Sequence, residues 1–336
     1  MSVLLKSLRL LFCLLAFALG LAATSWGLAR VTPAKHGANL DAKLKHWRAN
    51  KDTYDAVYIG SSMVNHHFIP ADFDAAMTQA GHPMRSFNLG MDGMWPPESF
   101  FILQEILKEK PSKLRWVFFE LMNFKPILEG NEETQRTVSW HDWRHTIMIT
   151  RHIFTVPLPG QRTLGEKLSL ASLHWKLFVR QTVRVGAGQD WLRIRFKLDR
   201  VKKPKPLEDD GYEGGNEGGL PEKDRARFVE VIGKLRLAEA VPIQPVLRDA
   251  LNDAITAIQK AGAEPVVVLS PVIYPTERFH DWPPAGLTFL NFSQPDYYPA
   301  LYEMGNRYDT DHLNPTGARE FTRSFAEEFA RRLAWK

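Results

Sequence analysis

The sequence predicts an α/β protein built on a three-layer α/β/α, doubly wound parallel sheet. Beyond residue 45, short apolar runs of strand length alternate with helical patterns, and repeated strand–helix–strand units are typical of parallel sheets. The run 114–121 is almost continuously apolar, as expected for a strand buried on both faces of such a sheet. Ligand sites of doubly wound sheets lie beyond the carboxyl ends of the strands.

The individual elements follow from local signals. The expected strands are 55–60, 85–90, 114–121, 264–270 and 287–292. The expected helices are 97–108, 246–261 and 315–333. Pro96-Pro97 marks the start of the first helix and Asn314-Pro315 that of the last, because proline fits the first turn of a helix.

The N-terminus predicts a membrane anchor. Residues 10–29 carry no charge between Arg9 and Arg30, and about 20 such residues suffice to cross a bilayer as a helix. A cleavable signal peptide is the alternative, since small residues at Ala22-Ala23 suit a signal peptidase. We expect residues 1–9 in the cytoplasm, a linker at 30–49, and the domain 50–336 on the extracytoplasmic (periplasmic) side of a bacterial inner membrane, or secreted after cleavage.

Composition narrows the class of protein. A chain of 336 residues with 44% apolar content suggests one large domain, or one domain with an insertion. The net charge is +5, but the basic residues are scattered without interleaved aromatics, so we expect no nucleic-acid partner. The single cysteine, Cys13, lies in the expected anchor, which leaves the exported domain without a disulfide or a cysteine metal site.

Residues 125–240 fit the strand–helix alternation least. They are rich in tryptophan and histidine, and we interpret them as an insertion of mixed structure that caps or flanks the site. Within them, residues 202–223 combine charge runs with many glycines, a composition that predicts a mobile loop.

Two short motifs indicate chemistry. Ser62 follows the strand that ends at Gly60, and His312 follows Asp309 by three residues. A serine at a strand-to-helix turn, with a histidine oriented by a carboxylate, is the minimum needed to activate an alcohol. Asp311 is the weaker orienting group because it is adjacent to His312. The pattern predicts acyl transfer or ester hydrolysis.

Each motif also has a structural interpretation. Ser62 could cap the helix that follows it. Asp309 and His312 could be ordinary turn and helix residues, and glycines at 90–93 could serve only a turn with positive φ. The His66-His67 pair suggests a metal, but no third ligand stands at a useful spacing, so we expect none.

The order of these segments resembles the SGNH (GDSL-like) hydrolases, which share the flavodoxin-like strand order. The resemblance is carried by Gly60-Ser61-Ser62, by 88–93, by 117–123 and by 309–312. It is strongest for the membrane-anchored branch, which includes alginate O-acetylation proteins and the D-alanine transfer protein of teichoic acid synthesis. It covers about 50–123 and 245–335.

The resemblance implies roles for single residues. Ser62 would be the nucleophile and His312 and Asp309 its partners. The oxyanion hole would be formed by Ser62 and Gly93, with Gly93 placed by matching Asn88 to the family's asparagine, and by Asn123. Two features depart from the family pattern: Ser61 replaces the usual aspartate, as in the anchored branch, and residues 120–123 are one residue short of the usual glycine-containing spacing.

The function implied is O-acetylation of an extracytoplasmic polysaccharide through an acyl-serine, without metal or organic cofactor. A membrane-bound O-acyltransferase would be the partner that supplies the acyl group. Two alternatives stay open: an exported esterase, lipase or carbohydrate deacetylase, and a non-catalytic scaffold that binds a polymer or a membrane partner.

Overall fold

In the computed structural model, the described residues are 3–31, 36–184 without 129, 133, 159 and 161, then 196, 208–273 and 279–334. They divide into two units. One comprises residues 1–38 and 126–203, and the other comprises residues 39–125 and 204–336.

The second unit contains a parallel sheet with the strand order β2-β1-β3-β4-β5 among the described residues. Its strands are β1 (Ala56–Gly60), β2 (Ser86–Gly90), β3 (Trp116–Glu120), β4 (Glu264–Leu269) and β5 (Thr288–Asn291). All five predicted strands are confirmed to within two residues. The order reverses at β1, so the carboxyl ends of β1 and β3 form the switch point where ligands bind in such sheets.

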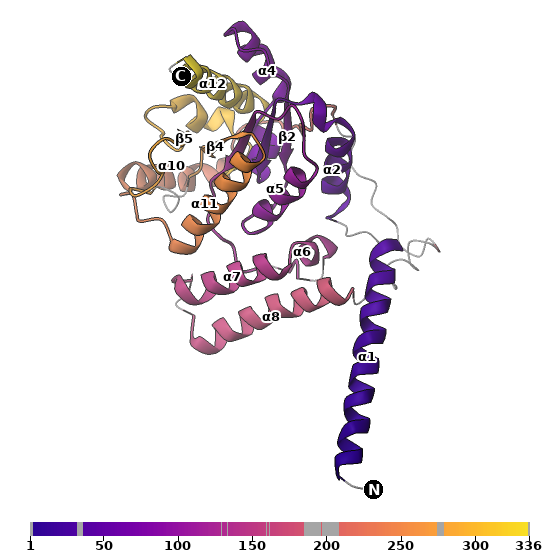
Figure 1. The fold of residues 1–336 in the computed structure, drawn as a ribbon. Helices are drawn as coiled ribbons and strands as arrows, with labels where there is room; N and C mark the ends of the chain where they lie inside the picture. The colour runs from indigo at the N-terminus through magenta and orange to yellow at the C-terminus, as the bar shows by residue number, and fades with distance from the viewer. Residues whose placement is uncertain are drawn as a thin grey trace. The chain divides into compact units, whose positions relative to one another are not determined.

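Helices from separate parts of the sequence pack around this sheet (Figure 1). They are α2 (Ala38–Asn50), α3 (Ser62–His67), α4 (Pro70–Gln79), α5 (Glu98–Lys108), α10 (Glu222–Leu237), α11 (Pro245–Lys260) and α12 (Pro315–Ala334). Helix α12 contacts α3 and α4, whereas α11 contacts α5. The predicted helices correspond to α5, α11 and α12, with ends within one residue.

Aromatic side chains fill the core between the sheet and α12. Phe118 of β3 meets Phe325 and Phe329 edge-on, at ring-centroid distances of 4.9 and 5.0 Å. Phe228 of α10 is buried in the same cluster. Edge-to-face pairs of this kind add to the hydrophobic gain of burial, so α12, which follows the histidine motif, is held firmly against the sheet.

The predicted linker 30–49 is wrong from residue 38 onward. Helix α2 occupies this stretch, and Leu40, Leu44 and Trp47 bury their side chains in the second unit. The spacing i, i+4, i+7 places these three residues on one helix face, so the sequence itself indicates a helix with a buried face here.

The predicted insertion and its mobile loop are also corrected in part. Residues 208–240 belong to the second unit, so the inserted segment ends near 203. Residues 208–221 are irregular but fixed: Asn88 N donates to Asp210 O at 2.8 Å, and Leu220 N donates to Met304 O at 3.0 Å. Gly211 has φ +83°, and a Cβ there would lie 2.3 Å from Asn88 O, so glycine permits this close approach. Residues 202–207 lie outside the described part.

The first unit is helical wherever it is described as regular, so the mixed structure predicted for the insertion is not confirmed. Its helices are α1 (Val3–Val31), α6 (Gln135–Ser139), α7 (Trp143–Thr155) and α8 (Leu164–Val183).

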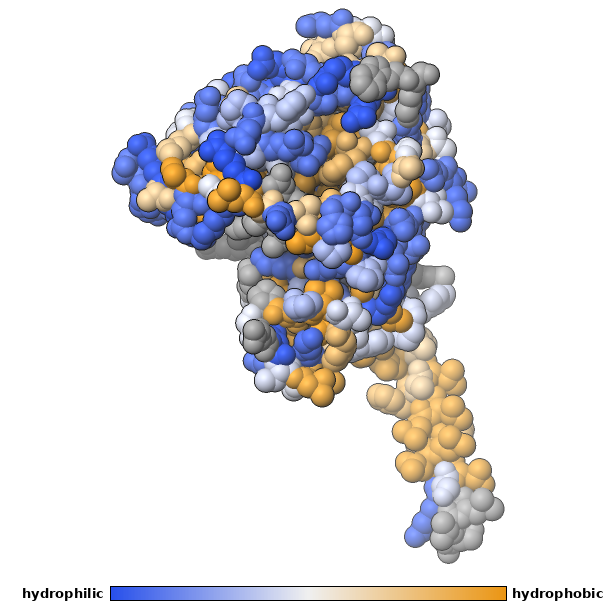
Figure 2. Space-filling model, turned by 90° about the vertical axis from the view of Figure 1, so that its left-hand side faces the viewer, coloured by the Kyte–Doolittle hydropathy of each residue, from blue (hydrophilic) through white to orange (hydrophobic). Residues whose placement is uncertain are grey.

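Among the described residues, one segment is long and apolar enough to cross a membrane or to act as a signal sequence: Leu5–Thr24, with a mean hydropathy of 2.0 and no buried residue. Figure 2 shows apolar side chains along the visible face of α1. This segment begins five residues before the predicted span 10–29, because the helix continues through Lys6 and Arg9.

Candidate active site

The turn after β1 presents Ser62 at the first position of α3. Ser61 precedes it as the N-cap, and its hydroxyl oxygen accepts from Met63 N at 3.2 Å. Ser61 is therefore the residue that caps α3, since a cap accepts from the second or third helical amide. The interpretation of Ser62 as a mere helix cap does not hold, and its hydroxyl makes a different contact.

Ser62, His312 and Asp309 lie together, although about 250 residues separate the serine from the other two. The distance from Ser62 Oγ to His312 Nε2 is 2.7 Å, and that from His312 Nδ1 to Asp309 Oδ2 is 2.9 Å. Both distances are those of ordinary hydrogen bonds. All three residues belong to the second unit and lie beyond the carboxyl ends of the strands.

The hydrogen bonds of Asp309 determine which ring nitrogen of His312 carries the proton. Burial would raise the pKa of Asp309, but hydrogen bonds from the His312 ring and from the backbone amides of Asp311 and His312 lower it instead. The ionised carboxylate only accepts, so Nδ1 of a neutral His312 ring carries the proton. Nε2 is then the acceptor for the Ser62 hydroxyl, which is the arrangement a general base requires.

Two rings hold the His312 loop in place. Tyr308 stacks on the His312 ring, with ring centroids 5.4 Å apart and an interplanar angle of 7°. His67 accepts a hydrogen bond from Leu313 N at 2.9 Å. Burial, together with the nearby charges of His312, Arg307 and His66, keeps the pKa of His67 well below its usual value. His67 is thus a neutral acceptor that fixes the loop rather than a second base.

The candidate oxyanion donors lie at the same edge of the sheet. Met91 N donates to Gly60 O at 3.0 Å, and Met94 N donates to Met91 O at 3.0 Å, which closes a turn with Gly93 at φ +67°. Asn123 is partly buried, three residues beyond β3. Their part in an oxyanion hole, and that of the Ser62 amide, stays a prediction.

Glu120 also contacts the turn at Ser61, although the sequence motifs assign it no role. It ends β3, is 2% exposed, and accepts from Ser61 N and from Ser270 Oγ, each at 2.6 Å. Burial raises its pKa, although these hydrogen bonds act in the opposite direction. A Cβ on Gly60 would lie 2.5 Å from its Oε2, so the glycine lets the carboxylate reach the turn. A single carboxylate at the end of an apolar strand is the sequence feature that marks Glu120 as a candidate for the site.

Replacing Glu120 separates its hydrogen-bonding role from its charge. We expect Glu120→Ala to lower the free energy of unfolding by about 2 kcal/mol more than Glu120→Gln, because alanine leaves the buried Ser61 N–H without an acceptor. Glutamine keeps an oxygen for Ser61 N–H and a donor for Ser270. Urea unfolding of both variants measures the difference, and equal midpoints would contradict this role.

Lys43 connects α2 to α3 and to the end of β2. Its side chain is fully buried in α2, and Nζ donates to Asn65 Oδ1 at 2.5 Å and to Gly90 O at 2.7 Å. Asn65 in turn donates to Asp92 Oδ1 at 2.9 Å. Lys43 therefore ties α2 to the segment that carries Gly93. No sequence signal identifies it, because its partners come from distant parts of the chain.

The buried ammonium predicts a pH dependence of stability. Burial lowers the pKa of Lys43 from 10.5 to about 8, against the opposing charges of Glu213, Asp92 and Asp210. Between pH 8 and 10.5 the unfolded chain binds more protons at this residue than the folded chain, so its contribution to stability rises with pH, by about 3 kcal/mol at most.

The difference in unfolding free energy between wild type and Lys43→Met should therefore shift in favour of wild type over this window. Urea titrations at several pH values measure it. A constant difference would contradict a buried, protonated Lys43.

The predicted histidine pair has no metal geometry. His66 contacts Asp92 Oδ1 at 2.8 Å and Glu213 O at 2.9 Å. Burial would lower its pKa, but these two acceptors raise it. Within the described ranges, no group of three His, Cys, Asp or Glu residues is placed to hold a metal ion. Both histidines instead join α3 to neighbouring loops.

Comparison with known proteins adds no family assignment: neither the protein-family models nor the curated protein sequences give a match to this chain.

Proposed function

We propose that Ser62 accepts an acyl group and passes it to a hydroxyl of an extracytoplasmic or cell-surface polysaccharide. The observation that carries this proposal is the chain of contacts from Ser62 Oγ to His312 Nε2, 2.7 Å, and from His312 Nδ1 to Asp309 Oδ2, 2.9 Å. A serine paired with a base, and a base oriented by a third group, is the diagnostic arrangement for nucleophilic catalysis.

The reaction follows from the proton positions. His312 takes the proton from the Ser62 hydroxyl as its oxygen attacks the acyl carbonyl, and Asp309 stabilises the imidazolium that forms. The amides of Ser62 and Gly93, with Asn123, are the proposed donors to the tetrahedral oxyanion. His312 gives the proton to the leaving group, which departs and leaves an acyl-serine. His312 then takes a proton from the acceptor hydroxyl as that oxygen attacks the acyl-serine, and returns the proton to Ser62. This scheme uses no metal or organic cofactor.

The fold supports an SGNH-type assignment. The strand order β2-β1-β3-β4-β5, with α12 in contact with α3 and α4 and with α11 against α5, suits a three-layer α/β/α arrangement of that superfamily. The nucleophile follows the first strand and the histidine precedes the last helix, the chain order on which the sequence resemblance rests.

Transfer rather than hydrolysis is favoured by the apolar helix. An anchored enzyme stays beside a donor in the same membrane, and Leu5–Thr24 is long and apolar enough for an uncleaved single-pass anchor. On this basis a membrane-bound O-acyltransferase is the proposed donor partner, and the second unit is proposed to lie outside the cytoplasm.

Hydrolysis is the second candidate, because the site is partly open. The Asp309 side chain is 41% exposed and that of His312 is 20% exposed. Water that reaches the acyl-serine would release free acid, as in an esterase or a carbohydrate deacetylase.

Competition for the acyl group tests the proposal. The full-length protein in detergent is supplied with 4-nitrophenyl acetate and a soluble polysaccharide oligomer, and the products are separated by mass spectrometry. Transfer predicts a Ser62-dependent acetylated oligomer, whereas hydrolysis gives acetate alone. A folded protein that forms neither product, and no acyl-serine, would support the scaffold function.

A further inference from the structure

The helix pair α7–α8 exposes an apolar face that its own unit does not cover. Its inward faces are occupied by residues such as Ile149 and Leu177, which are 0% and 1% exposed. On the outside, five large apolar side chains are 40–66% exposed. They are Trp143 and Phe154 on α7 and Leu164, Leu168 and Val179 on α8.

These side chains form one surface rather than isolated exposures. Leu164, Leu168 and Val179 recur at positions that share one face of α8. Trp143 of α7 meets Trp175 and Phe178 of α8 edge-on, with ring centroids 5.5 and 5.9 Å apart, which joins the two faces. Soluble proteins rarely expose a continuous apolar surface of this kind unless it binds something.

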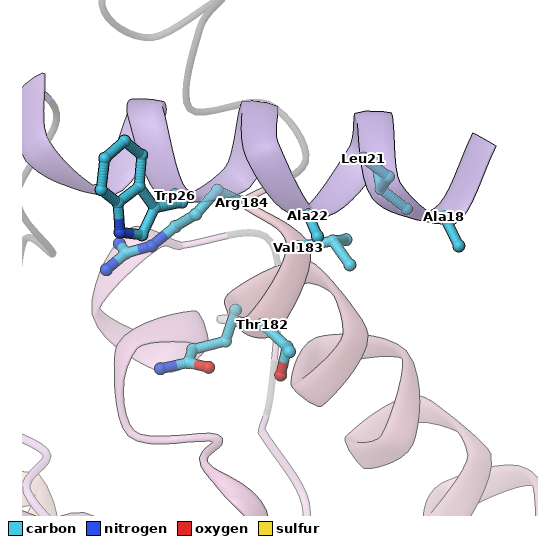
Figure 3. A pocket seen from close by; sticks show the side chains of 8 residues that line it. Ala18, Leu21, Ala22, Trp26, Thr182, Val183 and Arg184 are labelled. Atoms are coloured by element: carbon cyan, nitrogen blue, oxygen red, sulfur yellow. The ribbon is translucent and has the colours of Figure 1, made fainter. Parts of the chain in front are cut away.

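The end of α8 lies against the candidate membrane span. A groove between the two helices is lined by Ala18, Leu21, Ala22 and Trp26 of α1 and by residues 181–184 (Figure 3). Residues 18–22 fall within Leu5–Thr24, and Trp26 follows just beyond it. Helix α8 therefore ends near the level at which the span ends, where tryptophan and arginine are favoured. Figure 1 shows α7 and α8 running crosswise to α1.

The charge of the pair suits an anionic lipid surface. Residues 142–184 contain seven Arg or Lys and two Asp or Glu, so their net charge of +5 equals that of the whole chain. Basic residues beside an apolar helix face are typical of helices that lie in a membrane interface.

We propose that α7 and α8 lie on the membrane surface beside α1, with the face of Trp143, Phe154, Leu164, Leu168 and Val179 in the boundary between headgroups and acyl chains. The occupant of this face is lipid, since the same helix pair combines exposed apolar side chains, a net basic charge and contact with the span. The proposal rests on the proposed membrane placement of α1 and is independent of the acyl chemistry.

The test compares a fluorophore on the apolar face of α8 with one at the neighbouring position off that face. In the full-length chain, Cys13→Ser removes the only cysteine, and Leu168→Cys or Ser169→Cys then receives an environment-sensitive nitrobenzoxadiazole label. The two exposed positions are about 100° apart on the helix. In vesicles of phosphatidylcholine and phosphatidylglycerol, lipids with a shallow doxyl group should quench the Leu168→Cys probe several-fold more than the Ser169→Cys probe. The difference should shrink when phosphatidylglycerol is omitted.

Equal quenching of the two probes would overturn the proposal. If the Leu168→Cys probe is shielded from water only in vesicles that also contain membrane proteins, the face binds a protein partner and the proposal is overturned too. Alkaline carbonate extraction of the same vesicles reports on α1, and release of the chain would refute the anchor on which the proposal rests. Turnover of 4-nitrophenyl acetate in these samples reports separately on Ser62.

Discussion

Ser62→Ala is expected to reduce turnover of 4-nitrophenyl acetate by about 10⁴-fold or more, because it removes the hydroxyl that contacts the proposed base, His312. The Ser62 hydroxyl is 2.7 Å from His312 Nε2, and an alanine side chain offers no nucleophile there. Far-UV circular dichroism should be unchanged, since Ser62 supplies no side-chain cap to α3.

Ser61→Ala is the matched control. Ser61 is 2% exposed and its hydroxyl caps α3, so loss of the hydroxyl should cost about 1 kcal/mol of stability and change turnover by less than about tenfold. The backbone bond from Ser61 N to Glu120 remains in this variant. Full activity in a folded Ser62→Ala protein, with loss in Ser61→Ala, would transfer the nucleophile to Ser61.

Asp309→Asn is expected to reduce turnover by about 10³-fold to 10⁴-fold, as wrong-tautomer substitutions do in serine enzymes. The Asp309 Oδ1 atom already accepts from the amides of Asp311 and His312. An asparagine oxygen would keep those bonds and turn its NH₂ group toward His312 Nδ1. The ring proton would then move to Nε2, where it prevents His312 from taking the Ser62 proton.

Asp311→Asn is the control for charge near the histidine. Within the described loop the Asp311 carboxylate makes no hydrogen bond to the His312 ring, whereas both oxygens of Asp309 do. Steady-state kinetics of the two variants should therefore differ by more than about 10²-fold. Equal losses would show that net charge near His312, rather than the orientation of its ring, sustains the reaction.

The parts of the fold that depend on local pattern could be predicted. Buried strands such as Trp116–Glu120 are short apolar runs in the sequence, and Pro97 and Pro315 mark helix starts whatever the tertiary context. Helix α2 was missed because more than half of its residues are polar or charged, although Leu40, Leu44 and Trp47 have the spacing of a buried face.

Composition misled the prediction for residues 208–221. Glycines and charges there suggested mobility, yet Gly211 serves a close approach to β2, and Glu213 O accepts from His66. The contacts that hold this segment join residues far apart in the sequence, such as Asp210 with Asn88 and Leu220 with Met304, and no local pattern encodes them.

In the candidate site, too, some residues could be predicted from local patterns and others could not. Ser62, Asp309 and His312 could be predicted because each stands in a short motif at the end of an element. The roles of Glu120 and Lys43 could not be predicted, because they arise only when β3 packs beside the turn at Ser61 and α2 packs against Asn65 and Gly90. The sequence marks Glu120 only as a carboxylate at the end of an apolar strand. Residues that support the turn carrying Ser62 are determined by tertiary contact rather than by local spacing.

The most direct measurement is peptide mass spectrometry of the full-length, folded protein after brief exposure to 4-nitrophenyl acetate at mildly acidic pH, which slows release of the acyl group. We predict an acetyl group on Ser62 that hydroxylamine removes and that is absent from both Ser62→Ala and His312→Ala. An unmodified Ser62 in a protein that turns over the ester, or an acetyl group on Ser61 instead, would contradict it.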